Sequence, residues 1–207
     1  IRRQRQMCIR DRSENNPRLQ VVDLSEGLEL LYGTHHHEEG HLHDGEAYPD
    51  PHIWCSPRLA RRMVETMYRA LTEIDPDGAS VYAENYARID RRFAQLDSVL
   101  TDKLRPFKGK AFAVYHPTLS YWAADYGLRQ LALEPDGKSP SPQYLRAMVD
   151  SARHVGVEVV FIQQEFDPRQ AETFAREVGC RTEIINPLAY TWSEEICLLY
   201  TSDAADE

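Results

Sequence analysis

The stretch Ala79–Leu104, ASVYAENYARIDRRFAQLDSVLTDKL, decides the fold because it predicts one long amphipathic helix. Its apolar side chains recur in steps of three and four, with charged residues between them: Tyr82, Tyr86, Ile89, Phe93, Leu96 and Leu100. This spacing places them on one face of a helix. At a rise of about 1.5 Å per residue, the helix would extend on the order of 40 Å, comparable with a small domain's diameter. Such a helix can join two lobes.

Downstream of this helix the pattern changes to alternating strands and helices. Strands are predicted at 111–115, 129–133, 157–163 and 182–185, and helices at 119–126, 142–154 and 168–178. This alternation is typical of a parallel sheet covered by helices on its faces. His116 follows the first of these strands directly. Ligands in such sheets gather at the carboxyl ends of the strands, so His116 occupies a site position.

Upstream of the long helix, the sequence predicts a strand, a turn and a second helix. Leu19–Leu24 has the composition of a short strand, and Ser25 begins a turn or a helical stretch through Leu31. The second helix is predicted over 57–74, with Ser56 as N-cap and Pro57 at its first position. The predicted organisation is therefore an N-terminal lobe at 13–78, a connecting helix at 79–105 and a C-terminal α/β lobe at 106–195.

A stretch rich in histidine and acidic residues lies at 35–46, HHHEEGHLHDGE. Its imidazoles are those of His35, His36, His37, His41 and His43. Neutral imidazoles interleaved with carboxylates are typical of metal-binding tracts, above all for zinc. We interpret this stretch as an accessory metal-recruiting loop, and the alternative is a solvated polar loop. Asp50-Pro51-His52-Ile53-Trp54 follows closely and brings a further histidine to the start of the second helix.

The charge of the chain argues against one class of partner, and its hydropathy argues against a membrane-spanning helix. The formal net charge is −9, which argues against nucleic acid, because phosphate binding needs clustered Lys and Arg. No uninterrupted apolar run approaches the roughly 20 residues that a membrane-spanning helix needs.

Both ends of the chain have an unusual character. The two ends resemble the translated adapter of a transposase-based sequencing library and its reverse complement. They are residues 1–12, IRRQRQMCIRDR, and residues 196–207, which end in CLLYTSDAADE. We exclude them from the fold prediction as one would a fusion scar. The alternative is a genuine basic arm and acidic tail. The remaining body, 13–195, is predicted to be an internal fragment whose first lobe is incomplete.

The order of motifs in this body resembles the metal-binding solute receptors of zinc and manganese ABC importers. The motifs are the His/acid loop, DPHIWCSP at 50–57, the long helix, the strand that ends at His116, YGL at 126–128, SP at 141–142, AET at 171–173 and NPL at 186–188. The resemblance implies a two-lobed α/β fold, a helical-backbone periplasmic binding protein with parallel sheets, flanking helices and lobes joined by one long helix.

The resemblance also implies a site and a function. The metal would lie in the cleft between the lobes, with His52 and His116 as ligands and Asn186 as a possible neighbour. The family's earliest ligand histidine would lie upstream of Ser13, and some members have Asp at the position of Asn186. The His/acid loop is typical of the zinc branch, so Zn²⁺ is expected ahead of Mn²⁺. The receptor would be a monomer outside the cytoplasm, periplasmic or lipid-anchored, that delivers the ion to an ABC transporter permease.

Three alternatives stand beside this interpretation. They are a manganese-binding relative, an adhesin or metal-storage module on the same lobes, and a metallohydrolase. A hydrolase would use His52 and His116 as ligands with a carboxylate base such as Glu165. The body lacks the His-Glu-x-x-His, Gly-x-Ser-x-Gly and phosphate-loop motifs. We therefore expect a binding protein with no enzymatic activity.

Overall fold

The structure is a computed structural model that describes residues 12, 15–16, 18–32, 49–134 and 140–201. The His/acid loop predicted at 35–46 lies outside the described residues. The elements are η1 (Ile53–Cys55), α2 (Pro57–Ile74), η2 (Pro76–Gly78), α3 (Ala79–Leu104), η3 (Arg105–Phe107), β1 (Ala111–Val114), α4 (Ser120–Tyr126), β2 (Arg129–Ala132), α5 (Pro142–Val155), β3 (Val159–Gln163), α6 (Arg169–Val178), β4 (Arg181–Ile185) and α7 (Trp192–Thr201).

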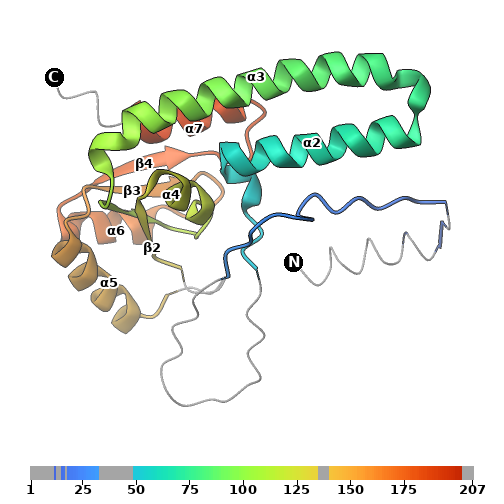
Figure 1. Cartoon of the computed structure of the whole chain (residues 1–207). Coiled ribbons are helices and arrows are strands. Elements are labelled where there is room, and N and C mark those ends of the chain that lie inside the picture. Colours follow the sequence, from blue (N-terminus) through green and yellow to red (C-terminus); the bar gives the residue numbers. More distant parts are fainter. Residues whose placement is uncertain (1–11, 13–14, 17, 33–48, 135–139, 202–207) are drawn as a thin grey trace.

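The two long helices form an antiparallel hairpin that projects beyond the α/β layers (Figure 1). α2 begins as predicted, because the Ser56 side chain accepts the backbone N–H of Leu59 and Pro57 takes the first helical position. The predicted helix over 79–104 is confirmed as α3. Tyr68 and Tyr86 stack between the two helices with ring centroids 4.7 Å apart.

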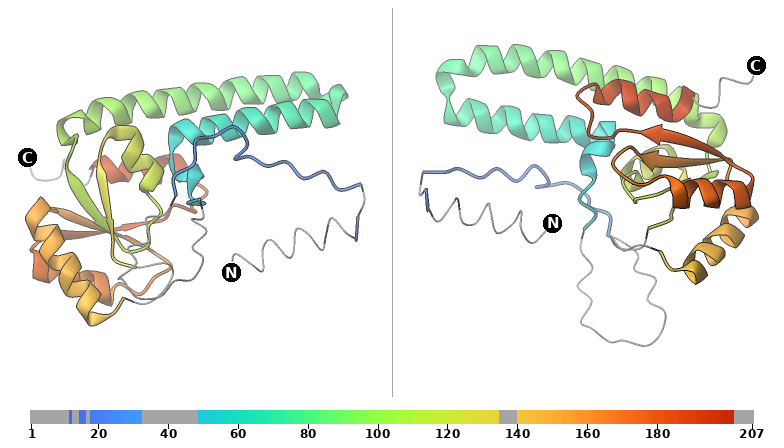
Figure 2. Two further views of the ribbon diagram at one scale, coloured as in Figure 1. Left: turned by 60° about the horizontal axis from the view of Figure 1, so that its bottom comes forward. Right: turned by 180° about the vertical axis from the view of Figure 1, so that it is seen from behind.

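The four described strands form one parallel sheet in the order β2-β1-β3-β4. Alternate side chains of each strand face opposite layers. One face packs on α3, α4 and α7, through Phe112, Val114, Phe161, Leu100, Trp122 and Ile196. The other packs on α5 and α6, through Ala113, Val160, Ile162, Ala152, Ala171 and Phe174. Figure 2 shows these helices on the two sides of the sheet. The predicted parallel sheet with covered faces is confirmed.

Glycines with a left-handed backbone end α4, α5 and α6. Gly127 after α4 has φ 69°, and Gly156 after α5 has φ 69°. Glycine adopts this conformation without the steric penalty that a Cβ atom brings. The turns at Gly127 and Gly156 direct the chain back into the sheet, at β2 and β3 respectively.

The predicted strand at Leu19–Leu24 is wrong. No described residue of this segment belongs to a strand, and Leu19, Val21 and Val22 are exposed. A strand forms only beside a partner that satisfies its backbone groups, and none of the described segments pairs with it. The following residues form the turn that was one of the two predicted possibilities, with Leu28 N–H donating to the Ser25 carbonyl at 3.1 Å.

α7 crosses the boundary predicted at residue 195. Ile196 and Leu199 are buried, with 2% and 5% of their surface exposed, in the core beside α3. Part of the segment excluded from the fold prediction therefore packs against the α/β layers. The adapter-like origin of residues 1–12 and 196–207 stays a prediction.

Arg58 fixes the start of α2 against the α/β layers. Its Nε donates to Asp97 Oδ1 on α3 at 2.8 Å, and its Nη1 donates to the Asp125 carbonyl on α4 at 2.9 Å. The guanidinium also lies over the ring of Tyr126, 5.1 Å from its centroid. One side chain thus joins three helices next to η1, the segment that follows His52.

Candidate metal site

His52 lies directly before η1, and Asp50 holds it from two residues upstream. Asp50 Oδ1 contacts His52 Nδ1 at 2.6 Å and accepts the His52 backbone N–H at 2.9 Å. The side chains are largely buried, with 15% of His52 and 10% of Asp50 exposed. Because the proline between them restricts the backbone, this short loop presents the imidazole in a defined orientation.

His116 lies directly after β1, at the carboxyl edge of the sheet. Its Nδ1 contacts the Glu134 carboxylate. Its main chain is held by Gln163 at the end of β3, which accepts the His116 N–H at 3.2 Å and donates to the His116 carbonyl at 2.6 Å. Gln163 is fully buried and also donates to Thr118 Oγ1 at 2.8 Å. The position of His116 is therefore fixed from both neighbouring strands.

The structure brings the two predicted histidines together. The ring centroids of His52 and His116 lie 5.2 Å apart, and their planes are at 85°. Trp54 meets His52 edge-on at 5.3 Å, and Phe166 stacks on His116 at 5.4 Å. Residues 64 positions apart thus form one partly buried pair with aromatic walls.

Each imidazole has a carboxylate on Nδ1. An ionised carboxylate only accepts hydrogen bonds, so beside one a neutral ring would carry its proton on Nδ1 and keep the lone pair of Nε2. Burial raises the pKa of Asp50, but hydrogen bonds from the His52 side chain and backbone outweigh it and hold that pKa below its usual value. Asp50 is therefore ionised at neutral pH. A carboxylate on the far nitrogen is typical of metal-binding histidines.

Tyr121 connects this pair to the base of the segment 33–48. Its hydroxyl accepts the Leu31 N–H at 3.1 Å and donates to the Asp50 carbonyl at 2.8 Å. Asp50 N–H in turn donates to the Leu31 carbonyl at 2.7 Å. The chain therefore enters and leaves the segment 33–48 at one place, beside Asp50 and His52. His35, His36, His37, His41 and His43 themselves lie outside the described residues.

Four other residues carry potential ligand atoms, and their surroundings differ from those of the two histidines. Asn186 follows β4, two strands from β1, and its Oδ1 accepts the Leu188 N–H at 3.1 Å. Glu165 is exposed in the turn after β3. Cys55 is buried in the core, where burial raises the pKa of its thiol, and it packs as a small apolar residue. Cys180 is a free, half-buried cysteine.

Sequence reasoning missed the roles of three residues: Asp50, Glu134 and Gln163. The first lies in a motif that was singled out, and the other two are brought to His116 by strand pairing. Among residues 12, 15–16, 18–32, 49–134 and 140–201, no group of three or more His, Cys, Asp or Glu side chains is arranged to hold a metal ion. The structure thus places His52 and His116 together, and the described residues add no such group around them.

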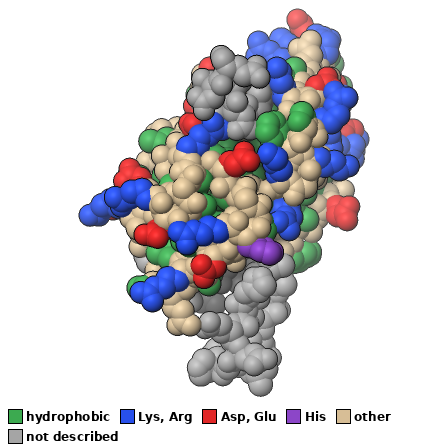
Figure 3. Space-filling model, turned by 90° about the vertical axis from the view of Figure 1, so that its left-hand side faces the viewer, with side chains coloured by type: hydrophobic (Ala, Val, Ile, Leu, Met, Phe, Trp, Pro, Cys, Tyr) green, Lys and Arg blue, Asp and Glu red, His purple; other side chains and the backbone are tan. Residues whose placement is uncertain are grey.

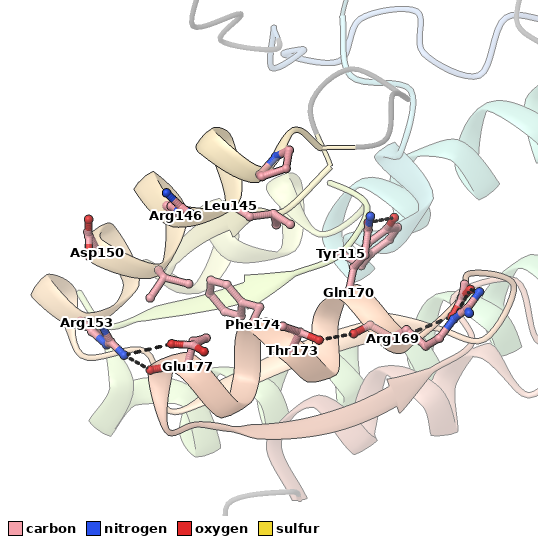
Figure 4. Close-up of a pocket in the computed structure, with 13 residues that line it drawn as sticks. Tyr115, Leu145, Arg146, Asp150, Arg153, Arg169, Gln170, Thr173, Phe174 and Glu177 are labelled. Carbon is pink, nitrogen blue, oxygen red and sulfur yellow. Dashed lines mark hydrogen bonds and ion pairs between the residues drawn. The ribbon is translucent and has the colours of Figure 1, made fainter.

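A groove of about 900 Å³ between α5 and α6 is a separate feature (Figure 4). Two ion pairs lie along it, one between Arg153 and Glu177 and one between Arg169 and Asp167. Neither histidine lines it. Basic and acidic side chains are also interspersed over the face in Figure 3. Within the described part of the chain, no helix is long and apolar enough to cross a bilayer.

Comparisons with known proteins agree with this architecture. The family model described as "Zinc-uptake complex component A periplasmic" (ZnuA) matches residues 7–200. The zinc-binding lipoprotein AdcA of Streptococcus pneumoniae (strain ATCC BAA-255 / R6) is 31% identical over 173 residues, 82% of this chain and 34% of that protein. The high-affinity zinc uptake system protein ZnuA of Bacillus subtilis (strain 168) is 29% identical over 180 residues, which cover 84% of this chain and 56% of that protein.

A solved structure, "Crystal structure of ZnuA", superposes with a TM-score of 0.84 at 30% identity, covering 96% of this chain and 74% of that one. A laminin-binding adhesin of Streptococcus agalactiae, at 23% identity and a TM-score of 0.76, shares the fold. The chain spans from about a third to just over half of the length of these curated relatives. By the match of the family model to residues 7–200, the chain belongs to the ZnuA family of periplasmic zinc-uptake components.

Proposed function

We propose that this protein captures Zn²⁺ with His52 and His116 and delivers it, outside the cytoplasm, to the permease of an ABC importer. The observation that carries the proposal is the histidine pair itself. Two imidazoles bound tetrahedrally, with Zn–N distances of about 2.0–2.1 Å, would place their ring centroids roughly 5 Å apart. The observed separation is 5.2 Å.

The surroundings of the pair also favour capture and release over catalysis. Both carboxylates that contact the imidazoles lie on Nδ1, so neither is free to act as a general base. A zinc site with few protein nitrogens and exchangeable remaining positions is compatible with handover to a second protein. The printed names of the relatives, a zinc-binding lipoprotein and a zinc uptake system protein, support zinc as the cargo.

Replacing either histidine tests this proposal. We expect His52→Ala and His116→Ala each to weaken zinc binding at least tenfold, because the ion must replace a protein ligand with water. Affinity is measured by competition with a chromophoric chelator, using the whole chain. His154→Ala is the matched control, since His154 is an exposed histidine near the end of α5. Unchanged affinity in both site variants, with both still folded, would contradict the proposal.

The predicted metal-recruiting loop leads to a second expected result. Deleting 35–43 should remove weak additional zinc sites and leave the tight site, because Tyr121 and Leu31 hold Asp50 independently of that segment. Zinc stoichiometry and the tightest dissociation constant are measured by calorimetry. A variant in which Gly and Ser replace 35–43 at equal length serves as the control for loop length. Loss of the tight site in both variants would show that the loop supplies tight ligands itself.

A further inference from the structure

We propose that Glu134 is the positioning residue of the site: its carboxylate keeps His116 protonated on Nδ1 and leaves Nε2 free for the ion. This inference rests on the proposed zinc-binding function of His116. It concerns a residue two positions beyond β2, which the sequence pattern did not indicate.

The register of the sheet places Glu134 beside His116. β1 and β2 pair with Val114 opposite Ala132, and two further steps along both strands bring His116 opposite Glu134. The ladder continues past the end of β2, because Leu133 N–H donates to the Val114 carbonyl and Glu134 N–H to the Tyr115 carbonyl, both at 2.9 Å. The backbone of Glu134 is therefore fixed before its side chain makes any contact.

Burial gives the contact its strength. Only 9% of the Glu134 side chain is exposed, and a buried carboxylate is costly unless hydrogen bonds replace its lost hydration. His116 Nδ1 is the donor that the structure provides. Phe166 stacks on the ring at an interplanar angle of 27°, and Gln163 holds the His116 main chain. The imidazole is thus held at its backbone, at one ring face and at Nδ1, and Nε2 remains as the ring atom that could bind an ion.

The same geometry separates positioning from direct ligation. The Glu134 carboxylate contacts His116 at Nδ1, whereas the lone pair that could bind an ion is on Nε2, at the other side of the ring. Glu134 therefore lies behind the imidazole with respect to Nε2. Removal of such a hydrogen-bonding partner typically lowers the metal affinity about 10- to 100-fold.

The test compares Glu134→Ala, Glu134→Gln and the control Glu172→Ala, an exposed glutamate of α6. Zinc affinity is measured by chelator competition, and the tautomer of metal-free His116 by ¹⁵N NMR of the histidine ring, with the signal assigned from His116→Ala. We expect wild type to show the Nδ1–H form. Glu134→Ala should lose this tautomer preference and about 10- to 100-fold in affinity.

Glu134→Gln keeps an oxygen acceptor for Nδ1–H, so it should retain the tautomer and recover part of the affinity. If Glu134→Ala keeps both tautomer and affinity, the proposal is wrong. If Glu134→Gln keeps the tautomer but binds zinc as weakly as Glu134→Ala, the carboxylate acts by its charge or as a ligand, which also overturns positioning. Unchanged affinity in His116→Ala would instead reject the proposed site. Weakened binding in that variant alone leaves the site standing and removes only the role of Glu134.

Discussion

Trp122→Ala is expected to lower the free energy of unfolding by about 3–5 kcal/mol, the usual range for emptying a large aromatic site in a core. Trp122 on α4 has 1% of its surface exposed. Its ring meets Phe112 of β1 and Tyr126 of α4 edge-on, with centroids 5.8 Å and 5.7 Å apart. The indole therefore fills the space between the sheet and α4, which also carries the Tyr121 hydroxyl to Asp50.

Trp122→Phe separates the volume of the side chain from its polar atom. The Trp122 indole N–H is buried and finds no hydrogen-bond partner among the described residues. An unsatisfied buried donor is costly, so the phenyl ring should recover most of the lost stability. Urea unfolding at constant m-value gives the comparison. Tyr190→Ala, at a fully exposed aromatic, should stay within about 0.5 kcal/mol of wild type. A loss below about 1 kcal/mol in Trp122→Ala would mean that the site collapses without a cavity.

Most of the fold is predictable from local pattern. The helices at 57–74 and 79–104 carry an N-cap or an apolar stripe. β1 and β3 are short apolar runs, and all four strands alternate with helices along the chain. The strand expected at Leu19–Leu24 failed because its formation depends on a partner, which no local pattern specifies. The adapter-like assignment of 196–207 likewise gave no hint that Ile196 and Leu199 would be buried.

The site was predictable only in part, for a related reason. His52 before a helix and His116 after a strand are visible as positions, and the structure brings them to 5.2 Å. Glu134 and Gln163 lie 18 and 47 residues from His116 and meet it through strand register. The neighbour of each strand and the register of each pair are tertiary facts. Once β1 is known to pair with β2, the register that sets Val114 opposite Ala132 also sets His116 opposite Glu134.

Gln163→Leu is expected to lower the free energy of unfolding by about 2–5 kcal/mol and to weaken zinc binding as well. Gln163 is fully buried and makes three contacts: with the N–H and the carbonyl of His116 and with the Thr118 hydroxyl. Leucine has a similar volume, so the loss arises from polar groups left without partners, each of which costs about 1–3 kcal/mol. The backbone at His116 must then move to recover hydrogen bonds, and this movement displaces the imidazole from His52.

Gln163→Glu and Gln164→Leu make the result specific. Glutamate can accept the His116 N–H but, when ionised, cannot donate to the His116 carbonyl. The stability and zinc affinity of Gln163→Glu should therefore lie between those of Gln163→Leu and wild type only if the hydrogen bond from the His116 N–H matters. Gln164 is the exposed neighbour, and its change to leucine should shift stability by no more than about 0.5 kcal/mol. Urea unfolding and zinc competition are measured on the same samples. If Gln163→Leu lost stability but kept zinc affinity, the ion itself would organise His116. If both fall together, the frame around His116 is built by the fold before any ion arrives.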